Sequence, residues 1–192
     1  MRTFALVLLA VAQSSPLPPG AVTLVNESHY GSLTALCADT GEPVVQHGPQ
    51  KIRATAVWAG ERSSLRRVQA GLGACDPAWS PDGRRLAVTS AEGLWVFPAQ
   101  SSQGSLRVEA RLPLGGTTNA YYRAFSQPRW SADGMLVGLL VANGATSWVE
   151  VFEAATGRLF YTSPPENYSF SWGGSGRDLR MGATEIRLPS YR

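Results

Sequence analysis

The stretch PAWSPDGRRLAV, residues 77–88, decides the fold class of this chain because its pattern returns further along the sequence. A near copy, PRWSADGMLVGL, occupies residues 128–139, and a more degenerate copy, SFSWGGSGRDLRM, occupies residues 169–181. The central tryptophans of the three copies lie 51 and 42 residues apart. A period of about 40–50 residues is typical of repeat architectures such as propellers and solenoids.

Each copy predicts a strand, a tight turn and a second strand. Pro presets the backbone at the second position of a turn, Asp bonds nearby backbone amides, and Gly accepts a positive φ. We therefore expect Asp82 and Asp133 to form turns and not to act as catalytic acids. The run Gly-Gly-Ser-Gly at 173–176 aligns with the same turn, which favours a turn there over a phosphate-binding loop.

A third strand is predicted after each hairpin, and a fourth strand follows in two of the three copies. The third strands are expected at 93–97, 147–152 and 184–188, and the fourth strands at 105–112 and 157–161. The fourth strands alternate polar and apolar residues, as half-exposed outer strands do. Four antiparallel strands per unit at this period indicate a propeller blade, and Trp79, Trp130 and Trp172 are expected to pack between blades.

The region before Trp79 is interpreted as a degenerate first copy of the same unit. Residues 33–37 would be its inner strand and 39–41 its turn, so that Cys37 stands at the tryptophan position, 42 residues before Trp79. The remaining strands of this unit are expected at 44–45, 52–58 and 65–68.

The predicted fold is an all-β, propeller-like array of about four four-stranded antiparallel blades. The last unit is one strand short, and the run Val-Thr-Leu-Val at 22–25 has no blade of its own. We therefore predict that residues 22–25 complete the last blade and close the ring, which would remove a free sheet edge. An open or partial propeller is the alternative.

The words at 77–83 and 128–134 resemble the TolB-like propeller repeat, a relative of WD-repeat blades, and the resemblance covers roughly residues 75–190. It implies a scaffold of the kind found in periplasmic interaction proteins or beside a hydrolase domain. Such propellers usually carry about six or more blades, whereas this chain has residues for four. A four-bladed ring, an open arc and half of a ring completed by a second copy therefore stay open. The Asp-box of sialidases is not matched, because Asp and Gly are adjacent here.

The first residues are typical of a secretory signal. Residues 1–12 combine an early basic residue, an apolar run and a small-x-small site at 10–12. The apolar run is too short to span a bilayer as a helix, so no integral membrane segment is expected after its removal. Residues 13–20 form a predicted linker and 21–192 a single domain, located in the bacterial periplasm or secreted.

The charge pattern argues against nucleic-acid binding. The 192 residues include 17 basic and 14 acidic side chains, for a formal charge of +3. The basic residues are scattered, and adjacent arginines occur only at 66–67 and 84–85, so no basic stripe is formed.

Cys37 and Cys75 are the two cysteines of the chain. Export permits a disulfide between them, because the periplasm and the cell exterior are oxidising. The alternative is two buried free thiols. Metal binding by this pair with His29 or His47 is a remote third alternative, so neither a metal nor a cofactor is expected.

A recognition patch is predicted at one mouth of the channel, where the loops 71–76, 117–127 and 163–168 lead into the inner strands. Tyr and Arg are enriched at interface hot spots. The alternative is that two of the tyrosines only cap the channel. The predicted patch consists of Tyr121, Tyr122, Arg123, Tyr168 and Asp76.

The leading functional hypothesis is an exported, non-catalytic domain that binds a protein, a peptide or an envelope glycan. Catalysis in propellers usually needs several His, Asp or Glu side chains converging on the channel, and this chain has two histidines and no Gly-x-Ser-x-Gly elbow. One alternative is a hydrolase or lyase of glycans or lactones with a channel active site. The other is a structural half-propeller that acts as a homo-oligomer.

Overall fold

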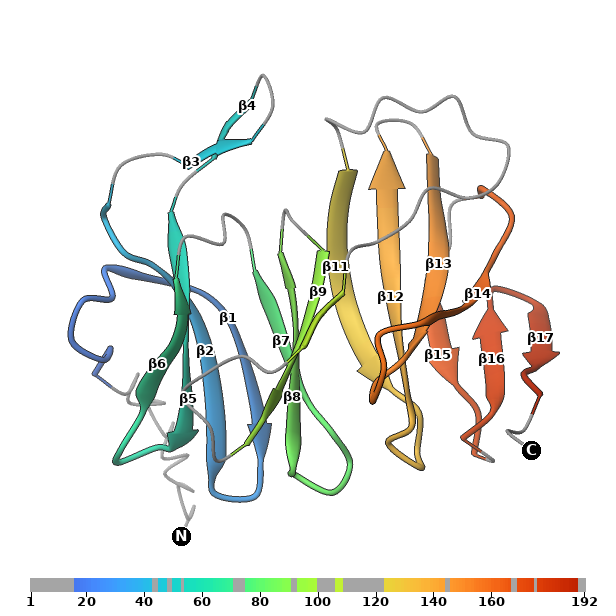
Figure 1. Ribbon diagram of the computed structural model, residues 1–192, viewed down its shortest axis with the longest axis horizontal. Helices are drawn as coiled ribbons and strands as arrows, with labels where there is room; N and C mark the ends of the chain where they lie inside the picture. The colour runs from blue at the N-terminus through green and yellow to red at the C-terminus, as the bar shows by residue number, and fades with distance from the viewer. Residues whose placement is uncertain are drawn as a thin grey trace, which may run out of the picture.

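The chain forms four antiparallel sheets that stand side by side in chain order along its long axis (Figure 1). The residues described have no helix. This arrangement confirms the predicted class, an all-β array of four propeller-type blades. The computed structural model describes residues 16–42, 45–47, 50–52, 54–70, 75–90, 93–99, 106–108, 123–143, 146–166, 169–174 and 176–189.

The first sheet contains, in spatial order, β1 (Thr23–Tyr30), β2 (Leu33–Asp39), β5 (Thr55–Glu61) and β6 (Arg66–Ala70). A tight turn joins β1 to β2, and its Gly31 has a φ of 55°. Its central strands are rich in small and β-branched residues, which suit a strand buried on both faces. A separate two-stranded hairpin, β3 (Val45–His47) and β4 (Gln50–Ile52), leaves the sheet between β2 and β5.

The predicted closure of the ring by residues 22–25 is wrong. Leu24 pairs with Ala38 of β2, so this run belongs to β1, the inner strand of the first sheet. Residues 33–37 are consequently the second strand of that sheet and not its inner strand. The first and fourth sheets lie at opposite ends of the long axis in Figure 1. The array is therefore the open arc that had been the alternative.

The second and third sheets each have four strands in simple meander order. The second contains β7 (Asp76–Trp79), β8 (Arg85–Ser90), β9 (Gly93–Pro98) and β10 (Leu106–Val108). The third contains β11 (Arg123–Trp130), β12 (Leu136–Asn143), β13 (Thr146–Glu153) and β14 (Leu159–Thr162). The predicted third and fourth strands of these two units fall on β9, β10, β13 and β14.

The fourth sheet has three strands among the described residues, β15 (Phe170–Trp172), β16 (Asp178–Met181) and β17 (Thr184–Arg187). Directly paired residues share a face of an antiparallel sheet. The face formed by Trp172, Leu179 and Ile186 packs against the third sheet. The opposite, outward face carries polar side chains, with Arg180 and Glu185 forming an ion pair of 3.3 Å.

The same turn is built after the inner strands of the second and third sheets. Ser80 Oγ donates to Asp82 Oδ1 at 2.6 Å, and the Arg84 N–H donates to the same oxygen at 3.0 Å. Ser131, Asp133 and the Met135 N–H repeat these bonds at 2.6 and 2.9 Å. Each turn also needs a glycine with positive φ, 67° at the second sheet and 68° at the third, because side chains disfavour that conformation. The repeated sequence thus forms a turn that is stabilised by hydrogen bonds of its own side chains.

The three repeated tryptophans occupy matching places at the ends of β7, β11 and β15. Trp79, Trp130 and Trp172 pair with Leu86, Val137 and Leu179 of the following strands. Trp130 Nε1 donates to the Ala78 carbonyl and Trp172 Nε1 to the Arg129 carbonyl, both at 2.9 Å. Each of these bonds joins one sheet to the residue before the tryptophan of the preceding sheet.

A disulfide between Cys37 and Cys75 joins the first sheet to the second. Cys37 lies on β2, Cys75 immediately precedes β7, and their Cα atoms are 5.8 Å apart. Both side chains are buried in the cluster that fills the space between the two sheets, together with Val57, Trp79 and Val88. The first junction of the arc is therefore covalent as well as apolar.

Candidate functional site

The structure places one side chain of the predicted recognition patch, Asp76 at the start of β7. Its Oδ2 accepts a 2.8 Å hydrogen bond from the backbone N–H of Gln127 in β11. Gln127 has a φ of 52° and lies where the pairing of β11 with β12 shifts register. Left-handed backbone at a residue other than Gly is uncommon and costs free energy. Asp76 therefore holds a strained bulge and ties the second inner strand to the third.

The other members of the patch are not placed by the structure. Tyr121, Tyr122 and Tyr168 lie outside the described residues, and only the backbone of Arg123, the first residue of β11, is described. The signal segment at 1–12 also lies outside the described residues, as do 13–15 of the predicted linker. In the described ranges, no helix is long and apolar enough to cross a membrane.

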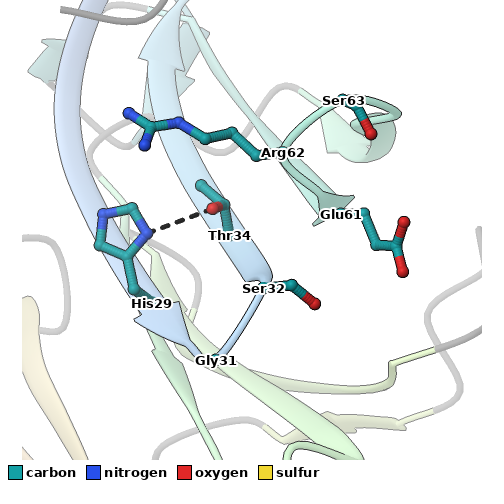
Figure 2. A pocket seen from close by; sticks show the side chains of 7 residues that line it. All are labelled: His29, Gly31, Ser32, Thr34, Glu61, Arg62 and Ser63. Atoms are coloured by element: carbon teal, nitrogen blue, oxygen red, sulfur yellow. Dashed lines mark hydrogen bonds between the residues drawn. The ribbon is translucent and has the colours of Figure 1, made fainter. Parts of the chain in front are cut away.

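A pocket of about 490 Å³ opens on the first sheet (Figure 2). Two turns supply most of its wall, the one between β1 and β2 and the one between β5 and β6. Leu33 pairs with Tyr30 on one side and with Glu61 on the other, which brings both turns to the same end of the sheet. The pocket is lined by His29, Gly31, Ser32, Thr34, Glu61, Arg62 and Ser63.

The pocket lies on the outward face of the first sheet. His29 pairs with Thr34, and Thr34 pairs with Gly60, so the His29 and Thr34 side chains share one face. The neighbouring residue Ala35 lies on the other face, in the cluster shared with the second sheet. In a closed ring, the outward face would be covered by another blade. The open arc leaves it free for a ligand.

Farther from the pocket, the outward face is apolar and covered in part, since Leu24, which pairs with Ala38, stays 41% exposed. Trp58 and Ala38 are buried there against Ala21 and Leu65. The Arg67 guanidinium lies 5.7 Å from the centre of the Trp58 ring, a cation–π contact. The pocket is thus a polar, accessible part of this face.

The pocket combines a cation, an acid and several hydroxyl groups. His29 Nδ1 lies 3.2 Å from Thr34 Oγ1, and His29 Nε2 lies 3.4 Å from Glu27 Oε2. In Figure 2 the Arg62 side chain extends across Thr34 toward the His29 side, whereas the Glu61 carboxylate points the opposite way. Such an arrangement can bind a polar ligand that carries both an anionic group and hydroxyl groups.

Asp82 and Asp133 are placed in turns and are engaged there. The hydrogen bond from Ser80, followed by that from the Arg84 N–H, lowers the pKa of Asp82 below its ordinary value. Burial by itself would raise the pKa of Asp133, but bonds from Ser131 and Met135 and the charge of Arg177 outweigh it and lower that pKa. Both groups are therefore carboxylates near neutral pH, which is the form that accepts the turn's hydrogen bonds.

The sequence singled out His29 only as a remote metal ligand and did not single out Glu61 or Arg62. Both cysteines are in the disulfide, so neither thiol is free. Across the part of the chain that the structure describes, no three His, Cys, Asp or Glu side chains gather as a metal-ion site would require.

Comparison with known proteins identifies the fold. No family model matches the sequence, and no curated protein matches it closely. The computationally designed Ika4 protein is similar over 92% of this chain and 99% of its own, at 9% identity and a TM-score of 0.58. The β-propeller domain of the trilobed protease from Pyrococcus furiosus is similar over 83% and 47%, at 15% identity and a TM-score of 0.51.

TolB from Acinetobacter baumannii is matched over 83% of this chain and 37% of its own, at 17% identity and a TM-score of 0.47. The chain thus spans nearly all of Ika4 but less than half of the other two chains. At these identities the similarities to Ika4 and to the trilobed protease domain establish architecture alone. The chain has a propeller-type fold of four blades arranged as an open arc.

Proposed function

We propose that this chain is an exported, non-catalytic, TolB-like propeller domain that binds a component of the bacterial envelope, and that it does so through the pocket on its first sheet. The observation that carries the proposal is the 490 Å³ pocket, in which exposed polar side chains converge from two turns. The volume is in the range usual for small-ligand sites of proteins, and the lining here is made of polar residues and one glycine.

The engagement of the other acidic side chains supports this choice of site. Asp76 holds the Gln127 amide, and Asp133 holds its own turn and Arg177. Arg62 and Glu61, in contrast, have no ion-pair partner among the residues described. Side chains that the fold does not use are the ones available to a ligand.

Assembly with a second copy is a weaker explanation of the open arc. The outward face of the fourth sheet is polar, with Arg180, Glu185, Asp178 and Arg187 on it. Polar outer faces are typical of the terminal units that cap repeat arrays. Sedimentation of the mature chain is therefore expected to give a monomer, and a stable dimer would favour the oligomeric half-propeller.

The test blocks the pocket and asks what binding is lost. Ser32→Trp would fill the pocket from the exposed β1–β2 turn, and Ala183→Trp, in the exposed turn between β16 and β17, is the matched control. Labelled wild type and variants are applied to arrays of envelope glycans and of periplasmic peptides. We expect a ligand that wild type and Ala183→Trp retain and Ser32→Trp loses.

A third variant tests the recognition patch predicted from the sequence. If Tyr122→Ala with Arg123→Ala abolishes binding while Ser32→Trp does not, the binding site is the recognition patch and not the pocket. If wild type retains no ligand in either array, the proposal of a binding domain is contradicted. Circular dichroism establishes beforehand that each variant keeps the sheet content of the wild type.

A further inference from the structure

We infer that the pocket on the first sheet takes a carboxylated sugar, a uronic acid within a saccharide. This inference rests on the proposed function, since it specifies the ligand of the same pocket. It is argued from the charge and the hydrogen-bonding groups of the lining residues His29, Ser32, Thr34, Glu61, Arg62 and Ser63.

The first step of the argument concerns the positive charge of Arg62. Arg62 presents a guanidinium toward the side of the pocket that holds His29 and Thr34 (Figure 2). A guanidinium offers a planar fork of N–H donors that matches the two oxygens of a carboxylate. Because Arg62 has no carboxylate partner among the described residues, this fork is available to a carboxylate from outside.

The second step is the hydrogen-bonding character of the rest of the wall. Ser32, Ser63 and Thr34 contribute hydroxyl groups, which donate and accept hydrogen bonds. The Glu61 side chain extends away from Arg62 and, because Glu61 pairs with Leu33, lies on the opposite face of the sheet from Thr34, so the hydroxyl groups are the partners offered to ligand hydroxyls. A ligand that satisfies both ends carries an anion on one side and hydroxyl groups on the other. A uronic acid has that distribution.

The third step is what the wall lacks. None of the seven lining residues has a large apolar side chain, and the imidazole of His29 is their one aromatic ring. Peptide side chains are usually anchored in pockets by apolar and aromatic contacts, so a peptide terminus would find an anion site here but no anchor. A polar ring that carries hydroxyl groups all round fits this wall better.

The fourth step is the rigidity of the floor. The Thr34 side chain is buried, with 4% of the residue exposed. It lies in β2, which pairs with strands on both sides, and its hydroxyl is 3.2 Å from His29 Nδ1. The floor is therefore fixed by the sheet, and only the two turns need to adjust when a ligand binds. Such preorganisation lowers the entropic cost of binding.

The experiment measures binding by calorimetry and by NMR shift mapping on the mature chain. The probes are galacturonic acid and a short oligogalacturonate, with galactose as the neutral match and acetate as the bare anion. Arg62→Met removes the charge and keeps much of the side-chain length. Arg187→Met, on β17 at the other end of the arc, is the matched control. Ser63→Ala removes one of the hydroxyl groups that line the pocket.

We expect the uronates to bind and to shift resonances of Ser32, Thr34 and Ser63. Arg62→Met should weaken this binding by about tenfold or more, as loss of a charge-assisted contact does, and Arg187→Met should leave it unchanged. Ser63→Ala should weaken the binding of the uronates but not that of acetate. Added salt should weaken binding through screening of the Arg62 contact.

Several results would overturn the inference. Equal binding of galactose and galacturonate, or of acetate and galacturonate, would exclude a site specific for a carboxylated sugar. Binding that survives Arg62→Met would exclude the assigned cation. If the uronates fail while a peptide or a neutral glycan is retained and Ser32→Trp loses it, the ligand class is wrong but the proposed function stands. If nothing binds, both fail.

Discussion

Trp130 Nε1 donates a 2.9 Å hydrogen bond to the carbonyl oxygen of Ala78, the residue before Trp79 in the preceding sheet. Trp172 makes the equivalent bond to the Arg129 carbonyl, one sheet further along. The repeated indole therefore spaces successive sheets by packing and also fixes them by a directed polar contact. Trp79 differs, because its Nε1 is buried and has no hydrogen-bond partner among the described residues.

This difference predicts unequal costs for the same substitution at Trp79 and Trp130. Both side chains are buried, with 7% and 8% of each residue exposed, so Trp→Phe removes a similar ring portion from each. Trp130→Phe also removes the bond to Ala78 and weakens the stacking of the Arg85 guanidinium, 5.0 Å from the Trp130 ring centre. We expect Trp130→Phe to cost about 1 kcal/mol more than Trp79→Phe in urea unfolding. Equal costs would show that the inter-sheet bond contributes nothing.

The disulfide is expected to carry a large share of the stability of the first junction. It closes a loop with a sequence separation of 38 residues, which the loop-entropy relation values at about 4 kcal/mol. Cys37→Ala with Cys75→Ala, or reduction of the wild type, should lower the free energy of unfolding by up to that amount. The double variant should not respond to reductant, and a wild type that is equally stable with and without reductant would contradict the prediction.

Gly83 is predicted to be coupled to Tyr30 across the first junction. A Cβ at Gly83 would overlap the Tyr30 ring, and the backbone there has a φ of 67°. Gly182 has a similar φ of 57° and no atom close to its Cβ position, so Gly182→Ala measures the backbone strain alone. We expect Gly83→Ala to destabilise the chain by about 1 kcal/mol more than Gly182→Ala.

A double-mutant cycle separates the contact from the strain. In a Tyr30→Ser background, the cost of Gly83→Ala should fall to that of Gly182→Ala, because the obstructing ring is gone. If the cost of Gly83→Ala is the same in both backgrounds, the two residues are not coupled. Chemical denaturation with a shared m-value provides the comparison.

The lowered pKa of Asp133 predicts that the free energy of unfolding decreases at acidic pH. Because the folded state lowers the pKa of Asp133, its contribution is present above the ordinary value of 3.8 and is lost as the pH falls through the lower, folded-state value. The wild type should therefore be more stable than Asp133→Asn at about pH 6, and the difference should shrink toward about pH 3. Thermal unfolding of both proteins across this range is the measurement. A constant difference would contradict the assigned role.

The parts of the fold that were predictable from sequence are those whose interactions are local. The Ser80–Asp82 and Ser131–Asp133 bonds and the positive φ of the next glycine all lie within four residues. The spacing of the tryptophans then gives the three blades that carry the repeated sequence. No contact between distant segments is needed for either inference.

The predicted inner strand of the first blade is wrong because the actual inner strand, β1, lacks the repeated sequence. The β1–β2 turn consists of Gly31 and Ser32, without the Trp-Ser-Pro-Asp-Gly pattern, so the copy was aligned one strand too late. Val45 was likewise expected in the blade but lies in the separate β3–β4 hairpin. Pairing of β1 with β2 is decided by which strands bury a common face, and that information is not local.

The candidate site could not be predicted for the same reason. His29 and Arg62 are distant in sequence and meet only because β1, β2 and β5 pair in register. Neither lies in a motif, and both turns have ordinary polar composition. Asp76, in contrast, was singled out from its position before an inner strand, and the structure gives it the Gln127 amide as a partner.

The first and last blades of the arc are attached to their neighbours by different kinds of contact. The first junction has the Cys37–Cys75 crosslink, which uses both cysteines of the chain. The last junction relies on the Trp172 bond, the Arg177–Asp133 ion pair of 3.2 Å and apolar contacts. Since each unit of a linear array is stabilised mainly by its neighbours, the C-terminal blade frays first. Amide exchange should accordingly be fastest in β15–β17 and slowest where the crosslink anchors the opposite end.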